Sequence, residues 1–296
     1  MATVSFVGRL LSIERDELIL AYVAPPLPIL GDEQFDPAVA ARAQGALNRA
    51  VFDEAVLRLP HEWQPKAERI ELSGAPGPQL LAAADGRGIE LIAVGCRGTG
   101  FFERFLMGSV SRAIIYSARV PVLVVKTTGG PNSEKLAGTA DGTFRMLAAF
   151  DGSEFGERIA ALVTKLSWPD RSRGWVIRVV QPMFVHQLPN WLEPLQRDPD
   201  VQAMAEAWQK EYDQQLERAV EEVQQYQAKL PAEFRATEPI VAQGNAAEQI
   251  LATIARQKID LAIVGSRGQG AVERLLVGST SARVLNEAPC SVLISR

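Results

Sequence analysis

The residues of this chain that are best suited to bind a phosphate group lie in two glycine-rich segments. The second segment supplies Gly265, Arg267, Gly268, Gly278, Ser279 and Thr280. Glycines let a backbone approach a phosphate closely, and a helix N-terminus presents N–H groups that lack an intrahelical partner. The two hydroxyls add donors, and the arginine adds a mobile positive charge. We therefore expect this segment to bind a polyphosphate.

The spacing of this segment differs from that of two common nucleotide-binding loops. It is not a Walker A loop, because no lysine follows a glycine before the hydroxyl residue. Its glycines are spaced as GxxGxG and follow a strand late in the half. The dinucleotide fingerprint, in contrast, follows the first strand of its fold. The alternative is that the glycines only form a tight turn and cap a helix.

The segment occurs twice, which argues against that alternative. Residues 89–126 and 259–296 align without a gap at an offset of 170 (259 against 89). The first copy supplies a second, less complete candidate site at Gly95, Gly98, Gly108 and Ser109. Each copy begins with an apolar run typical of a buried parallel strand, continues into a helix at its Gly-Ser pair and ends in an apolar strand.

Strands and helices alternate in both halves, which predicts an α/β fold with a parallel sheet covered on both faces. In the second half we expect strands at Arg145–Asp151, Trp175–Gln181, Arg235–Ala242, Asp260–Gly265 and Ser291–Arg296. A Gly-, Thr- and Ser-rich stretch at residues 127–143 is typical of a linker between domains.

A long helix is expected from about Pro199 to Leu230, with Asp198 as its N-cap. Asp36-Pro37 predicts the matching helix of the first half. The long helix carries an apolar stripe of Val201, Met204, Trp208, Tyr212, Leu216, Val220 and Val223. We expect this stripe to pack on the sheet of its own domain; the alternative is a face that binds a partner.

These features together resemble the universal stress protein family in a tandem form, over nearly the whole chain. The resemblance rests on the GxxG-x9-GS spacing, on Asp151-Gly152-Ser153 after a strand, and on the closing APCSVLIS segment. It implies two mainly parallel, doubly wound five-stranded α/β domains with strand order 3-2-1-4-5. The domains would comprise residues 1–126 and 144–296.

The resemblance also implies that the ligand is ATP, with or without Mg²⁺. Asp151 would contact the adenosine, and backbone near Val180 would meet the adenine. Gly265, Gly268, Gly278 and Ser279 would hold the phosphates. The alternative role for Asp151 is to cap the helix that starts near Glu154.

The first half departs from this pattern at its start. When Val23 is aligned with Val180, the counterpart of Asp151 falls before Met1, and Met1 falls opposite Arg158 inside a helix. The first half therefore lacks its first strand and has no equivalent carboxylate. Three alternatives stay open: Thr3–Val7 forms a replacement strand, the true chain starts upstream, or the remaining strands pair more closely.

Composition excludes several classes of partner. The net charge of -4, from 35 acidic and 31 basic side chains, gives no electrostatic reason to expect a nucleic acid or an anionic membrane. Two cysteines and two histidines cannot complete a structural zinc site, so no metal site is predicted. With no spanning segment or secretory signal in view, we expect no membrane insertion and a cytoplasmic location.

The expected function is that of an ATP-binding stress-response or signalling protein. Nucleotide occupancy of the second domain would modulate contacts with a protein partner that the sequence does not identify. Asp151 and Glu273 lie in no catalytic motif, so we expect no catalytic residues and at most slow ATP hydrolysis. The alternatives are a nucleotide-free interaction scaffold and an ATP-using enzyme of the wider adenine-nucleotide α-hydrolase-like group.

The apolar closing strands, Pro121–Lys126 and Ser291–Arg296, present edges that invite pairing. The resemblance implies that they pair with each other and make an internal pseudo-dimer from one chain. A further homodimer stays open.

Overall fold

The computed structural model describes residues 2–25, 36–96, 107–126, 142–181, 198–266 and 277–296. The first half contains α1 (Ala2–Gly8), β1 (Ile19–Ala24), α2 (Pro37–Leu57), η1 (His61–Trp63), β2 (Glu68–Ser73), α3 (Pro76–Gly86), β3 (Ile92–Gly95), α4 (Ser109–Ser117) and β4 (Val122–Val125). The second half contains β5 (Phe144–Phe150), α5 (Glu154–Lys165), β6 (Ser172–Val180), α6 (Pro199–Ala228), α7 (Ala232–Arg235), β7 (Ile240–Gln243), α8 (Ala246–Gln257), β8 (Leu261–Gly265), α9 (Ser279–Glu287) and β9 (Ser291–Ser295).

A seven-stranded sheet in the order β3-β4-β9-β8-β5-β6-β7 runs through both halves. The second half supplies β7-β6-β5-β8-β9, all parallel, which confirms the predicted order 3-2-1-4-5. Among the described strands of the sheet, only β4 and β9 pair in an antiparallel way, and Leu123 lies opposite Leu293. The predicted pairing of the closing strands is therefore confirmed, and it makes one sheet from two halves.

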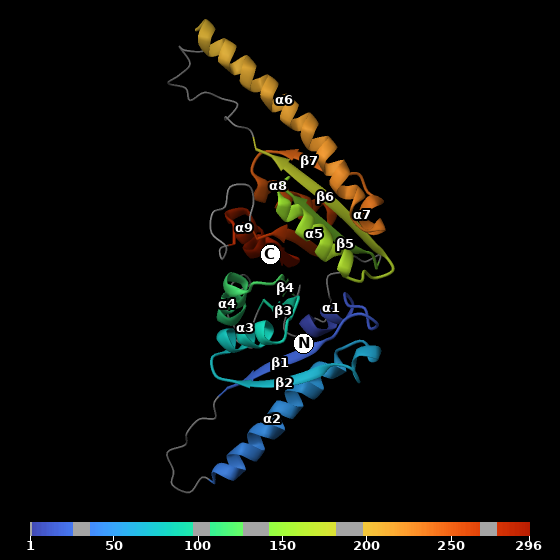
Figure 1. The fold of residues 1–296 in the computed structure, drawn as a ribbon, viewed down its shortest axis with the longest axis vertical. Coiled ribbons are helices and arrows are strands. Elements are labelled where there is room, and N and C mark those ends of the chain that lie inside the picture. The colour runs from blue at the N-terminus through green and yellow to red at the C-terminus, as the bar shows by residue number, and fades with distance from the viewer. Residues whose placement is uncertain (1, 26–35, 97–106, 127–141, 182–197, 267–276) are drawn as a thin grey trace.

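Helices cover this sheet on both faces (Figure 1). On one face, apolar side chains of α4, α8 and α9 pack on the strands, with α3 beside them. On the other face, the packing residues come from α1, α5, α6 and α7. Burying both faces of the strands accounts for their nearly continuous apolar sequences.

Among the described residues of the first half, no strand occupies the central position between β1 and β3, as predicted. Its remaining strands form two pairs: β3-β4 belongs to the large sheet, whereas β1-β2 is a separate parallel sheet of two strands. Residues 2–8 form the helix α1, so the alternative of a replacement strand at Thr3–Val7 is wrong. Closer pairing of the remaining strands is also wrong, because β1 and β3 lie in different sheets.

The position of α1 explains why β-branched residues form a helix there. Met1 aligns with Arg158 of α5, so α1 corresponds to the second part of that helix. Phe6 packs in the same core as Val163, its counterpart at the same offset, and its ring lies 5.8 Å from that of Phe144. Burial against the sheet therefore overrides the local preference for strand.

The long helix packs on its sheet only in part. Asp198 caps α6 by accepting hydrogen bonds from Asp200 N and Val201 N, as predicted, and Asp36 caps α2 in the same way. Of the predicted stripe, Tyr212 and Val223 are buried, but Met204 and Val220 are 43% and 41% exposed. The expectation that the whole stripe packs on the sheet is therefore wrong.

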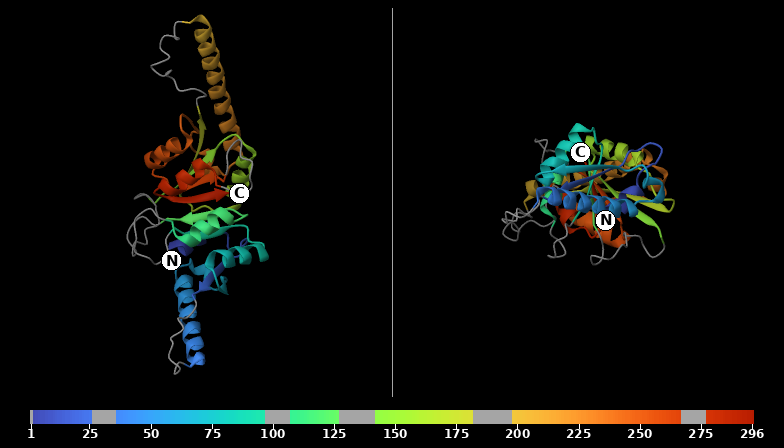
Figure 2. Two further views of the ribbon diagram at one scale, coloured as in Figure 1. Left: turned by 90° about the vertical axis from the view of Figure 1, so that its left-hand side faces the viewer. Right: turned by 90° about the horizontal axis from the view of Figure 1, so that it is seen from below.

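Geometry accounts for this difference. With 30 residues, α6 is about 45 Å long, whereas the nine residues of β6 span about 30 Å. The surplus projects beyond the sheet, and α2 projects from the opposite end of the molecule (Figures 1 and 2).

The strand expected at Arg235–Ala242 begins later, at Ile240. The preceding residues are held in a turn by Gln227, whose side-chain amide donates to the carbonyls of Phe234 and Thr237, both at 2.7 Å. Thr237 in turn donates to Gly174 O at 2.6 Å. These buried hydrogen bonds replace the ladder that the sequence pattern suggested.

Candidate functional site

Three predicted site residues lie at one edge of the large sheet. Gly265 ends β8, Asp151 follows β5 and Val180 ends β6, and these strands are neighbours in the order β8-β5-β6. Because all three strands are parallel, their carboxyl ends meet at the same edge. The predicted residues are therefore brought together by the fold.

The described residues on either side of the glycine-rich segment, 265–266 and 277–281, are hydrogen-bonded to each other at this edge, and we call them the glycine turn of the second half. Gly278 N donates to Ser266 O at 2.7 Å, and the Ser281 hydroxyl donates to Gly265 O. Gly278 is the N-cap of α9, and no side chain caps the helix there. The side chain of Ser279 is exposed and that of Thr280 is half-buried, so both are accessible at the helix N-terminus. The predicted Arg267 and Gly268 lie outside the described residues.

The carboxylate of Asp151 stabilises the turn that leads into α5. Its Oδ1 accepts hydrogen bonds from Ser153 N at 3.0 Å and from Ser153 Oγ at 2.6 Å. An aspartate that accepts from the backbone N two residues further on forms an Asx turn. Because Gly152 has a positive φ and α5 begins at Glu154, Asp151 is not itself the N-cap of that helix. Asp151 as a residue is partly exposed at the carboxyl end of β5, whereas the Oδ2 atom of its carboxylate is buried.

Arg178 supports the same turn from the neighbouring strand. Its guanidinium lies 5.6 Å from the centre of the Phe150 ring and 3.2 Å from Glu222 Oε2. A Cβ atom on Gly152 would lie 2.7 Å from the guanidinium, and Gly152 has a φ of +79°. Only glycine fits there, which gives the Asp-Gly-Ser sequence a structural reason independent of any ligand.

An aromatic pair lies beneath the turn. Phe150 stacks on Tyr226 with ring centres 4.2 Å apart, and a Cβ atom on Gly156 would collide with the Phe150 ring. Burial raises the pKa of Tyr226, and the nearby carboxylates of Glu157 and Asp151 raise it further. This tyrosine therefore stays neutral and acts as a rigid support for the end of β5.

The backbone at Val180 is engaged in the sheet on one side. Its carbonyl accepts a hydrogen bond from Gly244 N at 3.1 Å. Its side chain packs against Tyr212 and Ala219 of α6. The predicted contact with an adenine thus concerns a strand end that α6 already covers on one face.

The corresponding described residues of the first half, 95–96 and 107–111, form an equivalent glycine turn. Gly108 N donates to Cys96 O at 3.1 Å, and the Ser111 hydroxyl donates to Gly95 O at 2.6 Å. Gly108 is the N-cap of α4, again without a side-chain cap, and Ser109 is exposed. Gly98 lies outside the described residues. In the described part of the first half, no strand takes the place of β5, so this turn lacks a neighbour that could present a carboxylate.

Sequence reasoning missed three supporting residues. Ser111 and Ser281 tie each helix to its strand, and the signal for them was present, since a serine recurs two positions after each Gly-Ser pair. Arg178 gave no such signal, because it stands in an apolar strand without a counterpart in the repeat.

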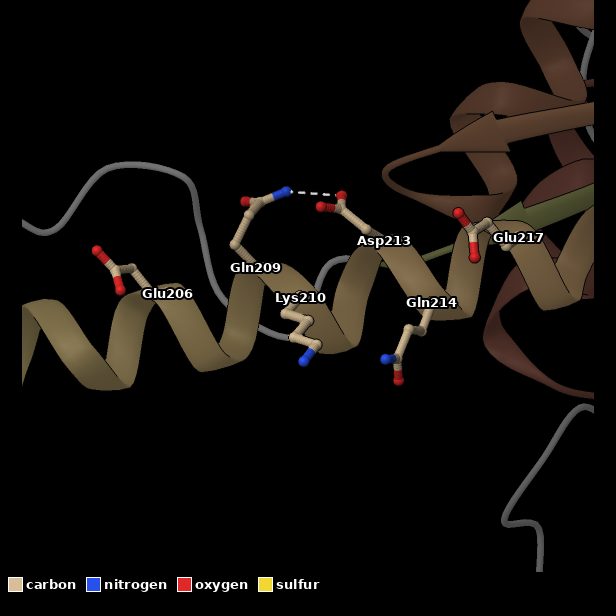
Figure 3. A pocket seen from close by; sticks show the side chains of 6 residues that line it. All are labelled: Glu206, Gln209, Lys210, Asp213, Gln214 and Glu217. Carbon is tan, nitrogen blue, oxygen red and sulfur yellow. Dashed lines mark hydrogen bonds between the residues drawn. The ribbon is translucent and has the colours of Figure 1, made fainter.

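A hollow on α6 offers no better site. Its lining comes from that single helix: Glu206, Gln209, Lys210, Asp213, Gln214 and Glu217 (Figure 3). Three carboxylates against one ammonium group disfavour a phosphate ligand. Within the described residues, no group of three or more His, Cys, Asp or Glu side chains could hold a metal ion. No helix among them is long and apolar enough to cross a membrane.

Comparisons with known proteins agree on one family. A sequence model of the universal stress protein family matches residues 2–126 and 180–296. The Thermus aquaticus "universal stress protein in QAH/OAS sulfhydrylase 3′ region" is 30% identical over 154 residues, which cover 51% of this chain and 97% of that protein. A universal stress protein from Mycolicibacterium smegmatis is 28% identical over 217 residues, 70% of this chain and 62% of that protein.

Solved structures show the same fold. The crystal structure of a universal stress protein from Archaeoglobus fulgidus matches with a TM-score of 0.59 at 20% identity, covering 100% of this chain and 93% of that one. A functionally unknown protein from Pseudomonas aeruginosa matches with a TM-score of 0.54 at 13% identity, covering 96% and 93% of the two chains.

Proposed function

Because the chain belongs to the universal stress protein family, we propose that it binds ATP in its second half and serves in a stress response or in signalling. The proposed ligand contacts are Asp151 for the adenosine, backbone near Val180 for the adenine, and the glycine turn for the phosphates. Thr280 of the same turn would add a contact, and so would Arg267 and Gly268 of the glycine-rich segment, which lie outside the described residues.

One observation carries this proposal: an uncapped helix N-terminus and the partly exposed residue Asp151 lie at the same edge of the sheet. The first turn of α9 has N–H groups without a side-chain cap, and these attract anions. Hydrogen bonds to a charged group contribute about 1.5–3 kcal/mol each, so a few of them offset the acidic net charge of the chain. The carboxylate of Asp151 can accept hydrogen bonds from ribose hydroxyls.

We further propose that nucleotide occupancy changes what this edge offers to a protein partner. ATP would bring three phosphates to the exposed Ser279 side chain and its neighbours. A partner that reads this edge would therefore distinguish the bound from the free form by charge.

Titration of the full chain with Mg-ATP in a calorimeter tests the proposal. We expect wild type to bind and Asp151→Ala to bind about 10- to 100-fold more weakly, since a hydrogen bond with a charged partner is lost. Ser153→Ala is the matched control, because it removes one donor to Asp151 but keeps the carboxylate. It should leave the affinity within about twofold while lowering stability by about 1 kcal/mol.

The hydrogen bonds between Asp151 and Ser153 favour a second candidate function, a nucleotide-free interaction scaffold. In that case the carboxylate serves α5 alone, and the glycine turns serve packing alone. Absence of binding heat in the wild type would support the scaffold. Equal losses of affinity in Asp151→Ala and Ser153→Ala would show that the turn, and not the carboxylate, governs binding.

A further inference from the structure

Each half contacts the helix that follows the glycine turn of the other half, α9 or α4, through one cationic side chain. Lys126 directly follows β4 of the first half, and its ammonium donates to Leu285 O at 2.5 Å and to Ala288 O at 2.7 Å. Both carbonyls belong to the carboxyl end of α9, whose C-cap is Ala288. A side chain of the first half thus holds the carboxyl end of α9 in the second half.

The reverse contact is made by Arg296, which directly follows β9. Its guanidinium donates to Ile115 O, near the carboxyl end of α4. Donors and acceptors are counterparts at the offset of 170, since Lys126 aligns with Arg296 and Ile115 with Leu285. The pair of contacts therefore follows the internal symmetry that the β4–β9 pairing creates.

Each cation satisfies groups that a helix cannot satisfy itself. The last carbonyls of a helix have no intrahelical donor, and the negative end of the helix dipole attracts a cation. Burial lowers the pKa of Lys126, while the neighbouring Cys96 and Cys290 oppose this change. An ammonium at a desolvated position depends on these carbonyls, so the contact fixes lysine and helix together.

The opposite end of α9 is the proposed phosphate site, and the helix is short. Its nine residues span about 14 Å, so a shift at Ala288 is transmitted to Ser279 along one rigid element. At the N-terminal end the helix is tied by the Ser281 hydroxyl to Gly265 O. Lys126 is the contact from the first half that holds the carboxyl end of this helix.

The same lysine is joined to the glycine turn of its own half. Cys96, the first residue after β3, donates from its backbone N to Val125 O at 2.9 Å, next to Lys126 in the chain. A conformational change at the glycine turn of the first half can therefore be transmitted through Val125 to the Lys126 ammonium at α9.

We propose that Lys126 is a positioning residue through which the first half sets the nucleotide affinity of the second half. Arg296 performs the equivalent task for α4. The inference rests on the proposed function, and it gives the tandem arrangement a regulatory consequence: the first half acts on the site without completing a site of its own.

Mg-ATP calorimetry and amide hydrogen exchange on the full chain test this inference, with Lys126→Met and its counterpart Arg296→Met as a matched pair. We expect Lys126→Met to weaken Mg-ATP binding about tenfold and Arg296→Met to leave it within about twofold. Exchange should rise at the first turn of α9 in Lys126→Met and at the first turn of α4 in Arg296→Met. Lys126→Arg should restore affinity to within about threefold of wild type.

The outcomes separate the inference from the proposed function. A wild type that binds no Mg-ATP would overturn both. A wild type that binds, with Lys126→Met binding equally well, would overturn the inference alone. Equal losses of Mg-ATP affinity in both methionine variants would also overturn it, because a general loosening of the seam between the halves, where β4 pairs with β9, would then explain the effect.

Discussion

The two glycine turns of the molecule share their geometry, whereas the sheets that present them differ. Both N-cap glycines adopt the same backbone conformation, with φ/ψ of -60°/151° at Gly108 and -60°/157° at Gly278. Both turns are closed by equivalent hydrogen bonds. Yet β8 lies between β9 and β5 inside the large sheet, and β3 lies at its end.

This difference shows that the turn is a local structure and does not depend on the central strand. Its conformation follows from glycines at the cap and from a serine that reaches back to the strand. The proposed nucleotide site includes in addition a neighbouring strand that is followed by a carboxylate, and among the described strands only β5 takes that place beside a glycine turn. An intact glycine motif is therefore insufficient evidence for a second site.

Restoring a central strand to the first half tests this comparison with the largest expected effect. Residues 144–157 directly precede Arg158, the counterpart of Met1, so a copy of them placed before Met1 supplies the missing strand and carboxylate. We expect the added strand to pair with β1 and β3 and to raise the Mg-ATP stoichiometry from one to two per chain. Amide exchange in β1 and calorimetry measure the two effects.

The control extension carries alanine at the position of the aspartate. It should protect β1 from exchange without adding a second site. If the extension leaves exchange in β1 unchanged, then the gap between β1 and β3 is not a strand position, and the comparison of the halves fails at its foundation.

A pair of buried aromatic residues tests whether the halves are stabilised separately. Trp63 lies in a small core formed by first-half residues, whereas Phe234 lies in the core of the large sheet. Replacing either with alanine removes about 3–5 kcal/mol of packing. We expect Trp63→Ala to accelerate amide exchange in α2, β1 and β2 only, and Phe234→Ala to accelerate it throughout the large sheet. If both variants accelerate amide exchange in β8 equally, the two halves unfold as one cooperative unit.

The sequence was informative where a signal is local or repeated. Asp36 and Asp198 were predicted as caps from Asp-Pro pairs, and the family resemblance implied both the strand order and the pairing of β4 with β9. In the candidate site, the same repeat and the resemblance brought Asp151, Val180 and Gly265 to one edge.

The remaining features depend on contacts between distant residues. Lys126 reaches a carbonyl 159 residues away and Arg296 one 181 residues away, and neither spacing leaves a pattern in the chain. The stripe of α6 was periodic throughout, but its packing depended on the length of β6, which periodicity does not report. For α1, local propensity favoured a strand, and only the alignment with α5 indicated a helix.

The smallest expected difference between the halves is a dependence of stability on pH at their seam. Cys290 is buried, and its counterpart in the first half is Val120, which does not titrate. Burial raises the pKa of Cys290 to about 12 from an ordinary value of 9.0, although the Lys126 ammonium lowers it in part.

In the unfolded chain the Cys290 thiol ionises above pH 9, whereas in the folded chain it keeps its proton up to about pH 12. The stabilisation is therefore complete below pH 9 and is lost as the pH rises from 9 to about 12. We expect urea titrations at increasing pH to show that the free energy of unfolding declines less for Cys290→Ala than for wild type. By pH 10 the decline should be smaller by about 1 kcal/mol. Tyr226 titrates in both proteins, and the Lys126 ammonium is coupled to the thiol, so the difference between the two curves reports the thiol together with its effect on Lys126. Parallel curves would show that the thiol ionises alike in both states, and the seam would then be as insensitive to pH at Cys290 as it is at Val120.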